Sequence, residues 1–212
     1  MFTIAAITIF SLVVLLFSVI IHELAHGYVA YSLGDPTAKY EGRLTLNPLK
    51  HLDPFGSFIL PLLLFISGSP FLFGWAKPVP VNPYNFRDKK YGDIKVSFAG
   101  PASNLLLAII FGLILRFIPD VIIFNNPGIG MALGYIVSIN IWLAVFNLIP
   151  VPPLDGSWIL FSLLPAGMEK FKFFLKQYGV VILVLLILFA GSLWFSITNI
   201  IFQVITGRVL TL

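Results

Sequence analysis

The chain of 212 residues contains no cysteine and few charges, with charged residues making up 10% of it. The absence of cysteine excludes disulfides and thiolate metal sites, so a metal ion would have to be held by imidazole or carboxylate groups. A charged fraction this low, together with 58% hydrophobic residues, lies outside the range of soluble globular domains. The composition therefore indicates a polytopic membrane protein embedded in a lipid bilayer.

Positive charge is missing from the first part of the chain, where no Lys or Arg precedes Lys39. The formal net charge is +4, but the basic residues lie in short segments between apolar runs, as membrane topology requires. No basic helix or groove suited to nucleic acid is evident, so no nucleic-acid partner is expected. By the positive-inside rule, the basic segments within 39–50, 77–95 and 170–176 are expected to be cytoplasmic.

Long apolar runs define the expected fold, which is an all-α polytopic membrane protein with about four to five transmembrane helices. The run at 55–75 is broken by Gly56, Pro61 and Pro70, among others, and is expected to be re-entrant rather than spanning. Polarity alternates from Thr37 to Leu46, which predicts a small membrane-associated β-hairpin. We expect one domain over 1–212, with the segments 1–33 (first helix), 36–47 (β-hairpin), 55–75 (re-entrant), 95–118 (central helix), 131–165 (broken helix) and 177–207 (C-terminal helix).

The sequence His22-Glu-Leu-Ala-His26 lies inside the first apolar run. In an α-helix, His22 and His26 lie about one turn apart on the same face, so both imidazoles can bind one metal ion. Glu23 lies beside them and can take a proton from a water molecule activated by zinc. The same pattern occurs by chance on solvated helices, but ionisable groups in a membrane span cost about 2.5 kcal/mol or more each, which favours a functional site.

Two histidines leave a zinc ion short of protein ligands, so a third ligand is expected from a distant segment. Among the remaining acidic residues, Asp155 alone has long apolar sequence on both sides. It follows three prolines that break the preceding helix, and a broken helix at membrane depth is acceptable where it lines a cavity. The alternative is that Asp155 only caps the helix that begins near Ser157. The predicted topology places Asp155 and His26 at similar depth, which favours the ligand.

These paired motifs resemble the site-2 protease family of intramembrane zinc metalloproteases. The resemblance rests on His22 to His26 together with Asn147-Leu-Ile-Pro-Val-Pro-Pro-Leu-Asp-Gly156, and Phe98 to Asn104 is similar to the central helix motif of that family. It implies that His22, His26 and Asp155 bind one Zn²⁺ per chain and that Glu23 is the catalytic carboxylate. The chain resembles the short prokaryotic type, without PDZ or CBS domains.

Other polar residues are assigned more modest roles. Asn147 either donates to the oxyanion or to the attacking water, or it satisfies backbone groups at a helix end. Gly100, Pro101 and Asn104 are expected to kink and pack a helix rather than to take part in chemistry. His51 is expected to cap or pack a loop, because a catalytic zinc keeps one position for water.

The predicted function is zinc-dependent hydrolysis of peptide bonds in or near transmembrane segments, in a multi-pass protein of the cell membrane whose active site lies towards the cytoplasm. The expected partners are transmembrane protein substrates, with a homo-oligomer or a separate regulatory protein as further partners. Because hydrolysis needs an extended backbone, the substrate is expected to add as a strand beside Thr37 to Leu46. The alternative is a membrane metal-binding or ion-transport protein in which the same His and Asp residues line an ion path.

Overall fold

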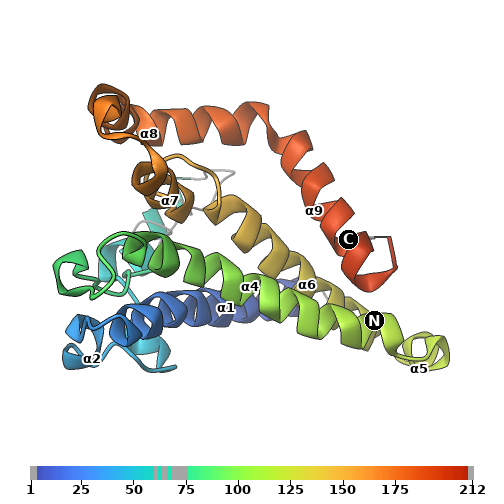
Figure 1. Ribbon diagram of the computed structural model, residues 1–212. Helices are drawn as coiled ribbons and strands as arrows, with labels where there is room; N and C mark the ends of the chain where they lie inside the picture. The colour runs from blue at the N-terminus through green and yellow to red at the C-terminus, as the bar shows by residue number, and fades with distance from the viewer. Residues whose placement is uncertain (1–3, 60–61, 64–65, 68–75, 210–212) are drawn as a thin grey trace.

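The computed structural model describes residues 4–59, 62–63, 66–67 and 76–209, and this part of the chain is mainly helical. Figure 1 shows α1, α4 and α6 lying side by side, with α8 above α7 and α9 descending from the end of α8 towards α6, so that α8 and α9 form an arch. The helical elements are α1 (Ile4–Ser32), α2 (Thr37–Tyr40), η1 (Pro48–Lys50), η2 (Pro54–Ile59), η3 (Pro83–Asn85), α4 (Gly92–Phe117), α5 (Asp120–Asn125), α6 (Pro127–Asn147), α7 (Asp155–Leu163), η4 (Ala166–Met168), α8 (Glu169–Phe189) and α9 (Gly191–Thr206).

In the part of the chain that the structure describes, four helices are long and apolar enough to cross a membrane: α1, α4, α6 and α8. They carry exposed aliphatic and aromatic side chains along their outer faces, which suits contact with lipid rather than water. This pattern confirms the predicted multi-pass membrane fold. The end of the chain differs in detail from the single helix expected at 177–207: a break at Ala190 separates α8 from α9, just before Gly191, a residue of low helix propensity.

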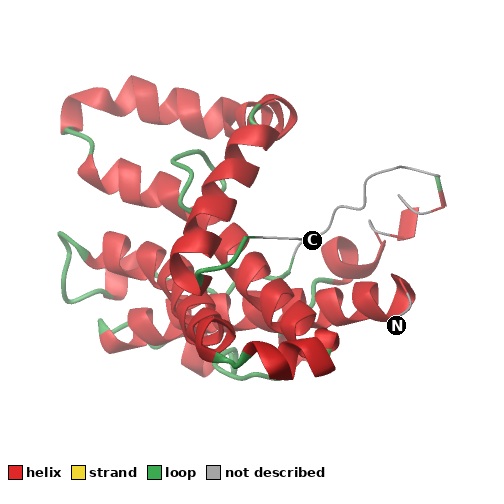
Figure 2. Cartoon of the chain, turned by 90° about the vertical axis from the view of Figure 1, so that its right-hand side faces the viewer, coloured by secondary structure: helices red, strands yellow, loops and turns green. Residues whose placement is uncertain are grey.

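Helix α4 is the centre of the bundle and packs against α1, α6, α7 and α9. A buried cluster of apolar side chains joins α4, α6 and α9, and it comprises Ala108, Leu115, Val137, Ile141 and Phe202. Figure 2 shows the same bundle turned by 90°, with the α1, α4 and α6 layer below the arch. The central position of α4 allows its side chains to reach both α1 and α6.

Polar contacts fix the directions of the three central helices. His26 contacts Val96 and His22 contacts Asn104, so α1 and α4 run antiparallel. Asn140 of α6 contacts both Asn104 and Ser18, and Figure 1 shows α6 running from α5 towards α7, in the same direction as α1. The end of α1, the start of α4 and the end of α6 therefore lie at the same end of the bundle.

The predicted β-hairpin at 36–47 is wrong. Residues Thr37–Tyr40 form the short helix α2, followed by turns, and no strand is assigned in the described ranges. Asp35 accepts a hydrogen bond from the backbone N–H of Thr37, Pro36 precedes the first helical residue, and Gly42 takes a positive φ of 62°. An acidic side chain that accepts from the N–H of the first helical residue, a proline at the helix start and a glycine just after its end are helix signals, and they outweigh the alternating polarity. The proposed edge for substrate addition is lost with the hairpin.

The predicted re-entrant segment at 55–75 falls largely on residues 60–61, 64–65 and 68–75, which lie outside the described ranges. Its two flanks are described, and they meet. Leu52 and Ala76 form an isolated antiparallel bridge, and the N–H of Lys77 donates to the carbonyl of His51 at 2.8 Å. The residues on either side of this segment therefore lie next to each other.

Candidate metal centre

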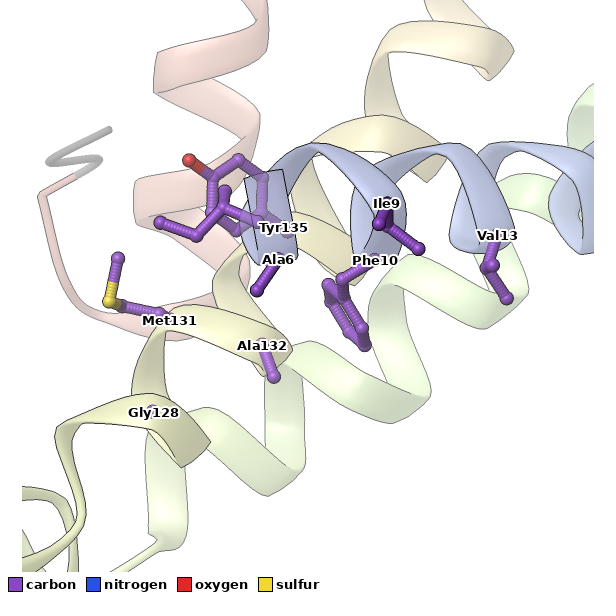
Figure 3. Close-up of a pocket in the computed structure, with 9 residues that line it drawn as sticks. Ala6, Ile9, Phe10, Val13, Gly128, Met131, Ala132 and Tyr135 are labelled. Carbon is purple, nitrogen blue, oxygen red and sulfur yellow. The ribbon is translucent and has the colours of Figure 1, made fainter. Parts of the chain in front are cut away.

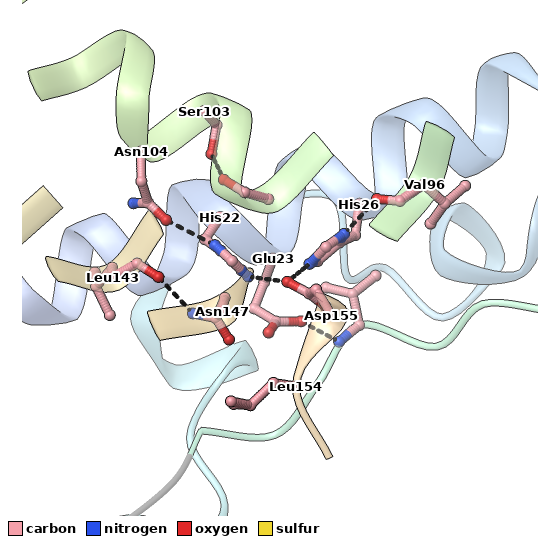
Figure 4. A network of polar contacts seen from close by, with 12 residues as sticks. His22, Glu23, His26, Val96, Ser103, Asn104, Leu143, Asn147, Leu154 and Asp155 are labelled. Carbon is pink, nitrogen blue, oxygen red and sulfur yellow. Dashed lines mark hydrogen bonds and ion pairs between the residues drawn. The ribbon is translucent and has the colours of Figure 1, made fainter. Parts of the chain in front are cut away.

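Three side chains that can bind a metal ion meet at the end of α1. Helix α1 supplies His22 and His26, and α7 begins with Asp155. Oδ2 of Asp155 lies 3.0 Å from Nε2 of His22 and 3.3 Å from Nε2 of His26. Figure 4 shows the carboxylate of Asp155 pointing towards both imidazoles. One ligand atom from each residue lies within 4.8 Å of the others, a spacing that one metal ion can bridge.

Asp155 reaches the histidines because the chain breaks between α6 and α7. Asp155 is the first residue of α7 and the N-cap position is Leu154, which argues against a cap as the only role of Asp155. The following Gly156 packs directly on the backbone of Leu148, where any Cβ would overlap the carbonyl group. The Asp-Gly pair therefore joins a candidate metal ligand, Asp155, to the close backbone contact of Gly156 that positions it.

The far nitrogens of both imidazoles are engaged by α4. Nδ1 of His22 lies 2.7 Å from Oδ1 of Asn104, and Nδ1 of His26 lies 2.7 Å from the carbonyl oxygen of Val96. Because both partners are acceptors, each Nδ1 carries the proton. Each Nε2 lone pair is then free for a metal ion, and the hydrogen bond fixes the ring orientation.

Asn104 belongs to a buried polar network rather than serving only to pack a helix. Its amide nitrogen donates to the carbonyl of Ser18 and to Oδ1 of Asn140, whose own amide donates to Oγ of Ser18. Asn104 is fully buried, with 0% of its surface exposed. This role was not predicted from the sequence, although a polar amide in an apolar helix, four residues after a glycine, indicates such a network.

Gly100 provides the space in which the imidazoles sit. A Cβ at this position would lie 2.5 Å from Nε2 of His22 and would also overlap Nε2 of His26. Such contacts do not occur between real atoms, so only glycine allows α4 to approach the two rings this closely. The need for glycine at position 100 is thus explained by the two imidazoles next to it, and not by a helix kink alone.

The remaining candidates take different positions. Glu23 is half-buried beside the cluster, and its Oε2 accepts a hydrogen bond from the backbone N–H of Val79 at 2.7 Å. Asn147 lines the same cavity, but its amide donates to the carbonyl of Leu143 one turn earlier in α6. His51 is buried in a loop, where Nε2 lies 2.7 Å from the carbonyl oxygen of Thr45, and it is not part of the cluster.

A cavity of about 440 Å³ opens onto the cluster, and its walls include both histidines, Glu23, Asp155 and Asn147. A larger cavity of about 610 Å³ lies between the start of α1 and α6 and is lined by apolar residues such as Phe10 and Met131 (Figure 3). The larger one lacks the convergent polar groups that chemistry requires. The smaller cavity is therefore the candidate active site.

Comparison with known proteins gives a consistent result. The family model described as "Peptidase family M50" matches residues 120–191. The chain is 42% identical over 192 residues to "Putative zinc metalloprotease YwhC" of Bacillus subtilis, covering 87% of this chain and 84% of that protein. It is 35% identical over 182 residues to "Putative zinc metalloprotease Rip2" of Mycolicibacterium smegmatis, covering 85% of this chain and 67% of that protein. No solved structure matches.

The resemblance seen in the motifs is therefore confirmed over most of the chain. Two functions were considered for the His and Asp residues, a zinc-dependent protease and an ion-transport protein. The long match to the Bacillus protein favours the protease. The four membrane-capable helices agree with catalysis by a multi-pass membrane protein. The chain belongs to peptidase family M50, the site-2 protease family of intramembrane zinc metalloproteases.

Proposed function

We propose that His22, His26 and Asp155 hold one zinc ion per chain and that Glu23 is the catalytic carboxylate of an intramembrane endopeptidase. One observation carries this proposal: two histidines of α1 and a carboxylate 129 or more residues later direct their ligand atoms at a common point. Glu23 follows His22 directly in the sequence and faces the same cavity.

The donor set suits zinc. Two neutral imidazoles and one carboxylate match the three protein ligands of catalytic zinc sites, which keep a further position for water. Gly100 and the two Nδ1 contacts hold the rings for such an ion. A zinc ion bound there lowers the pKa of water towards about 7 and polarises a carbonyl group.

The protein side chains handle the proton. Glu23 is placed to accept the proton of the attacking water and to deliver it to the leaving amine. Asn147 has a second amide hydrogen besides the one it donates to Leu143, and this hydrogen is available to a developing oxyanion in the cavity. The peptide bond of the substrate has to be extended, because the carbonyls of an intact helix are already hydrogen-bonded along its axis.

The site lies near one end of the membrane-capable helices, which agrees with cleavage of substrates near one membrane surface. His26 lies six residues before the end of α1, and α4 begins only four residues before Val96. The basic segments at 39–50 and 77–95 connect these two helix ends, so we propose that the active site lies towards the cytoplasm. Regulated proteolysis, with a regulatory protein or a second copy selecting substrates, is part of this proposal.

The test is cleavage of a panel of single-span membrane peptides by the purified, zinc-loaded protein. Wild type is expected to cut, and Glu23→Gln is expected to lose about 10³-fold in kcat while its zinc content stays the same. His22→Ala, His26→Ala and Asp155→Ala are expected to lose the metal, as measured by elemental analysis. Full zinc occupancy in Asp155→Ala would remove Asp155 from the site, and wild-type cleavage by Glu23→Gln would refute the role of Glu23.

A further inference from the structure

A proline-rich segment forms one wall of the catalytic cavity. Pro78, Val79 and Val81 line the cavity together with His22 and Glu23. No helix or strand is assigned from 77 to 82, and each residue before a proline is restricted to extended conformations. Lys77, Val79 and Asn82 all precede prolines, and Asn82 has the extended angles φ −113° and ψ 100°. We call residues 77–82 the wall segment.

A single backbone group of the wall segment contacts the catalytic carboxylate. The N–H of Val79 donates to Oε2 of Glu23 at 2.7 Å. Pro78 and Pro80 have no N–H, so Val79 carries the only donor in this run of three residues. The other oxygen of Glu23 makes no hydrogen bond to the described residues. The carboxylate is therefore held at one oxygen and open at the other.

The buried side chain of Arg43 holds the wall segment in place. Its Nη2 donates to the carbonyl of Lys77 at 2.7 Å and to the carbonyl of Pro78 at 3.2 Å. Gly27 of α1 makes room on the other side, because a Cβ there would lie 3.0 Å from the Val79 side chain. The pairing of Leu52 with Ala76 fixes the start of the segment.

Burying the charged side chain of Arg43 costs free energy, and favourable contacts have to offset that cost. The residue is only 4% exposed, and its Nε and Nη1 have no hydrogen-bond partner in the part of the chain that the structure describes. Burying a charged group without full pairing is costly, and an apolar side chain would fill the same space without that cost. The two hydrogen bonds to the carbonyls of Lys77 and Pro78 are the contacts that only the guanidinium, and not an apolar side chain, makes here.

We propose that the wall segment, held by Arg43, positions Glu23 for catalysis. The N–H of Val79 holds Oε2, so that Oε1 faces the attacking water. Val79 and Arg43 are then positioning residues, because they act through Glu23 and not on the substrate. This inference rests on the proposed catalytic role of Glu23.

The decisive variant is Val79→Pro, measured in the full-length, zinc-loaded protein with a single-span peptide substrate. It removes the amide hydrogen, and the backbone at this position already precedes a proline and is restricted accordingly. We expect kcat to fall by about 10- to 100-fold, because misplacing a catalytic group by about 1 Å costs that much. KM and zinc content are expected to stay within about twofold, because the lost contact acts in the transition state.

Val79→Ala is the matched comparison, because it shortens the side chain but keeps the N–H. We expect it to change KM more than kcat, since Val79 also lines the cavity. If both variants at this position lose kcat equally, the side chain and not the N–H matters, and the proposal is overturned.

Arg43 gives an independent test that does not depend on the folding of a proline variant. Arg43→Met removes the donors but keeps an apolar side chain, and it is expected to lose kcat like Val79→Pro. Arg43→Lys keeps a cationic group with three donors, and because a single nitrogen of Arg43 makes both hydrogen bonds, it is expected to retain more kcat than Arg43→Met. Equal losses in the two Arg43 variants, with zinc content retained, would contradict the proposal.

A double variant separates this inference from the role of Glu23 itself. In a Glu23→Gln background, Val79→Pro is expected to cause no further loss of residual kcat beyond about twofold, because the two residues act as a unit. Additive losses would overturn the positioning role. Wild-type cleavage by Glu23→Gln alone would instead show that the catalytic assignment of Glu23 is wrong.

Discussion

Asn104 and His22, 82 residues apart, form a buried contact of 2.7 Å between Oδ1 and Nδ1. The amide nitrogen of Asn104 is committed to Ser18 and Asn140, so its oxygen faces the ring. This contact sets the tautomer of His22 and directs Nε2 towards Asp155.

Removing this contact is expected to weaken metal binding. Asn104→Ala should lower the zinc affinity by about 10- to 100-fold, the usual effect of losing a partner that orients a ligand. Competition with a chromogenic chelator measures the change. Ser103→Ala is the control, because Ser103 donates to the carbonyl of Gly100 and does not contact either imidazole. Equal affinities in Asn104→Ala and wild type would show that the network does not support the metal site.

A second prediction concerns the close approach of Gly100 to the two imidazoles. In Gly100→Ala the added methyl group would lie 2.5 Å from Nε2 of His22, so the rings have to move. We expect lower zinc content and a loss of at least about 100-fold in cleavage, since a displacement of about 1 Å suffices for that. Gly134→Ala is the matched control in α6, because nothing lies within 4 Å of a Cβ there. It should keep activity and raise stability by up to about 1 kcal/mol. Similar behaviour of the two variants would refute the steric argument.

Membrane topology can be tested without background labelling, because the chain contains no cysteine. Cysteines introduced at the exposed positions Lys50 and Lys89 are expected to react with an impermeant thiol reagent only after the cytoplasmic face is opened. A cysteine at the exposed Asn126, before α6, is expected to react in intact cells. If Lys50 and Lys89 differed in accessibility, the region between them would cross the membrane, and the matched depth of the three ligands would need another explanation.

Asp35 links the end of α1 to the segment before α4 and gives a pH-dependent prediction. It is fully buried and accepts hydrogen bonds from the backbone N–H of Asn82 and the side-chain amide of Asn85. Burial acts to raise the pKa of the Asp35 carboxyl, but the hydrogen bonds from Asn82, Thr37 and Asn85 outweigh it and hold the pKa below its ordinary value of 3.8. A lowered pKa stabilises the fold above pH 3.8, and this stabilisation is lost as the pH falls through the folded-state pKa.

Asp35→Asn is therefore expected to lower the free energy of unfolding by about 2 kcal/mol at neutral pH, because it places an amide donor where the carboxylate accepts. The difference from wild type should shrink once the pH falls below the ordinary pKa of the carboxyl. Thermal unfolding in detergent at a series of pH values measures this. Glu41→Gln, at an exposed position, should change stability by less than about 0.5 kcal/mol. A constant difference between Asp35→Asn and wild type at every pH would contradict the linkage.

Local sequence signals were misleading where two patterns compete. The segment from Thr37 to Leu46 alternates in polarity, yet Asp35, Pro36 and Gly42 enforce a helical turn. Hydrogen bonds between near neighbours decide such short segments, and polarity alternation alone does not report them. The expected helix at 177–207 was likewise divided at Ala190, because apolar character does not reveal a single poor helix position.

The sequence by itself determined the membrane class, the family and the identity of the candidate metal ligands. Composition excludes a soluble domain, helical spacing joins His22 to His26, and Asp155 stands out as a carboxylate between apolar stretches. Each of these depends on local periodicity or on residue type, which a sequence carries directly.

Only the tertiary structure decided how the two histidines and Glu23 are held. The contacts of Asn104 with His22, Val96 with His26 and Val79 with Glu23 join residues 82, 70 and 56 positions apart. In two of these three contacts the partner is a backbone group, and the side-chain identity of that residue does not reveal where its backbone lies. Such contacts arise from the packing of α4 and the wall segment against α1, and so they appear only once the helices are assembled.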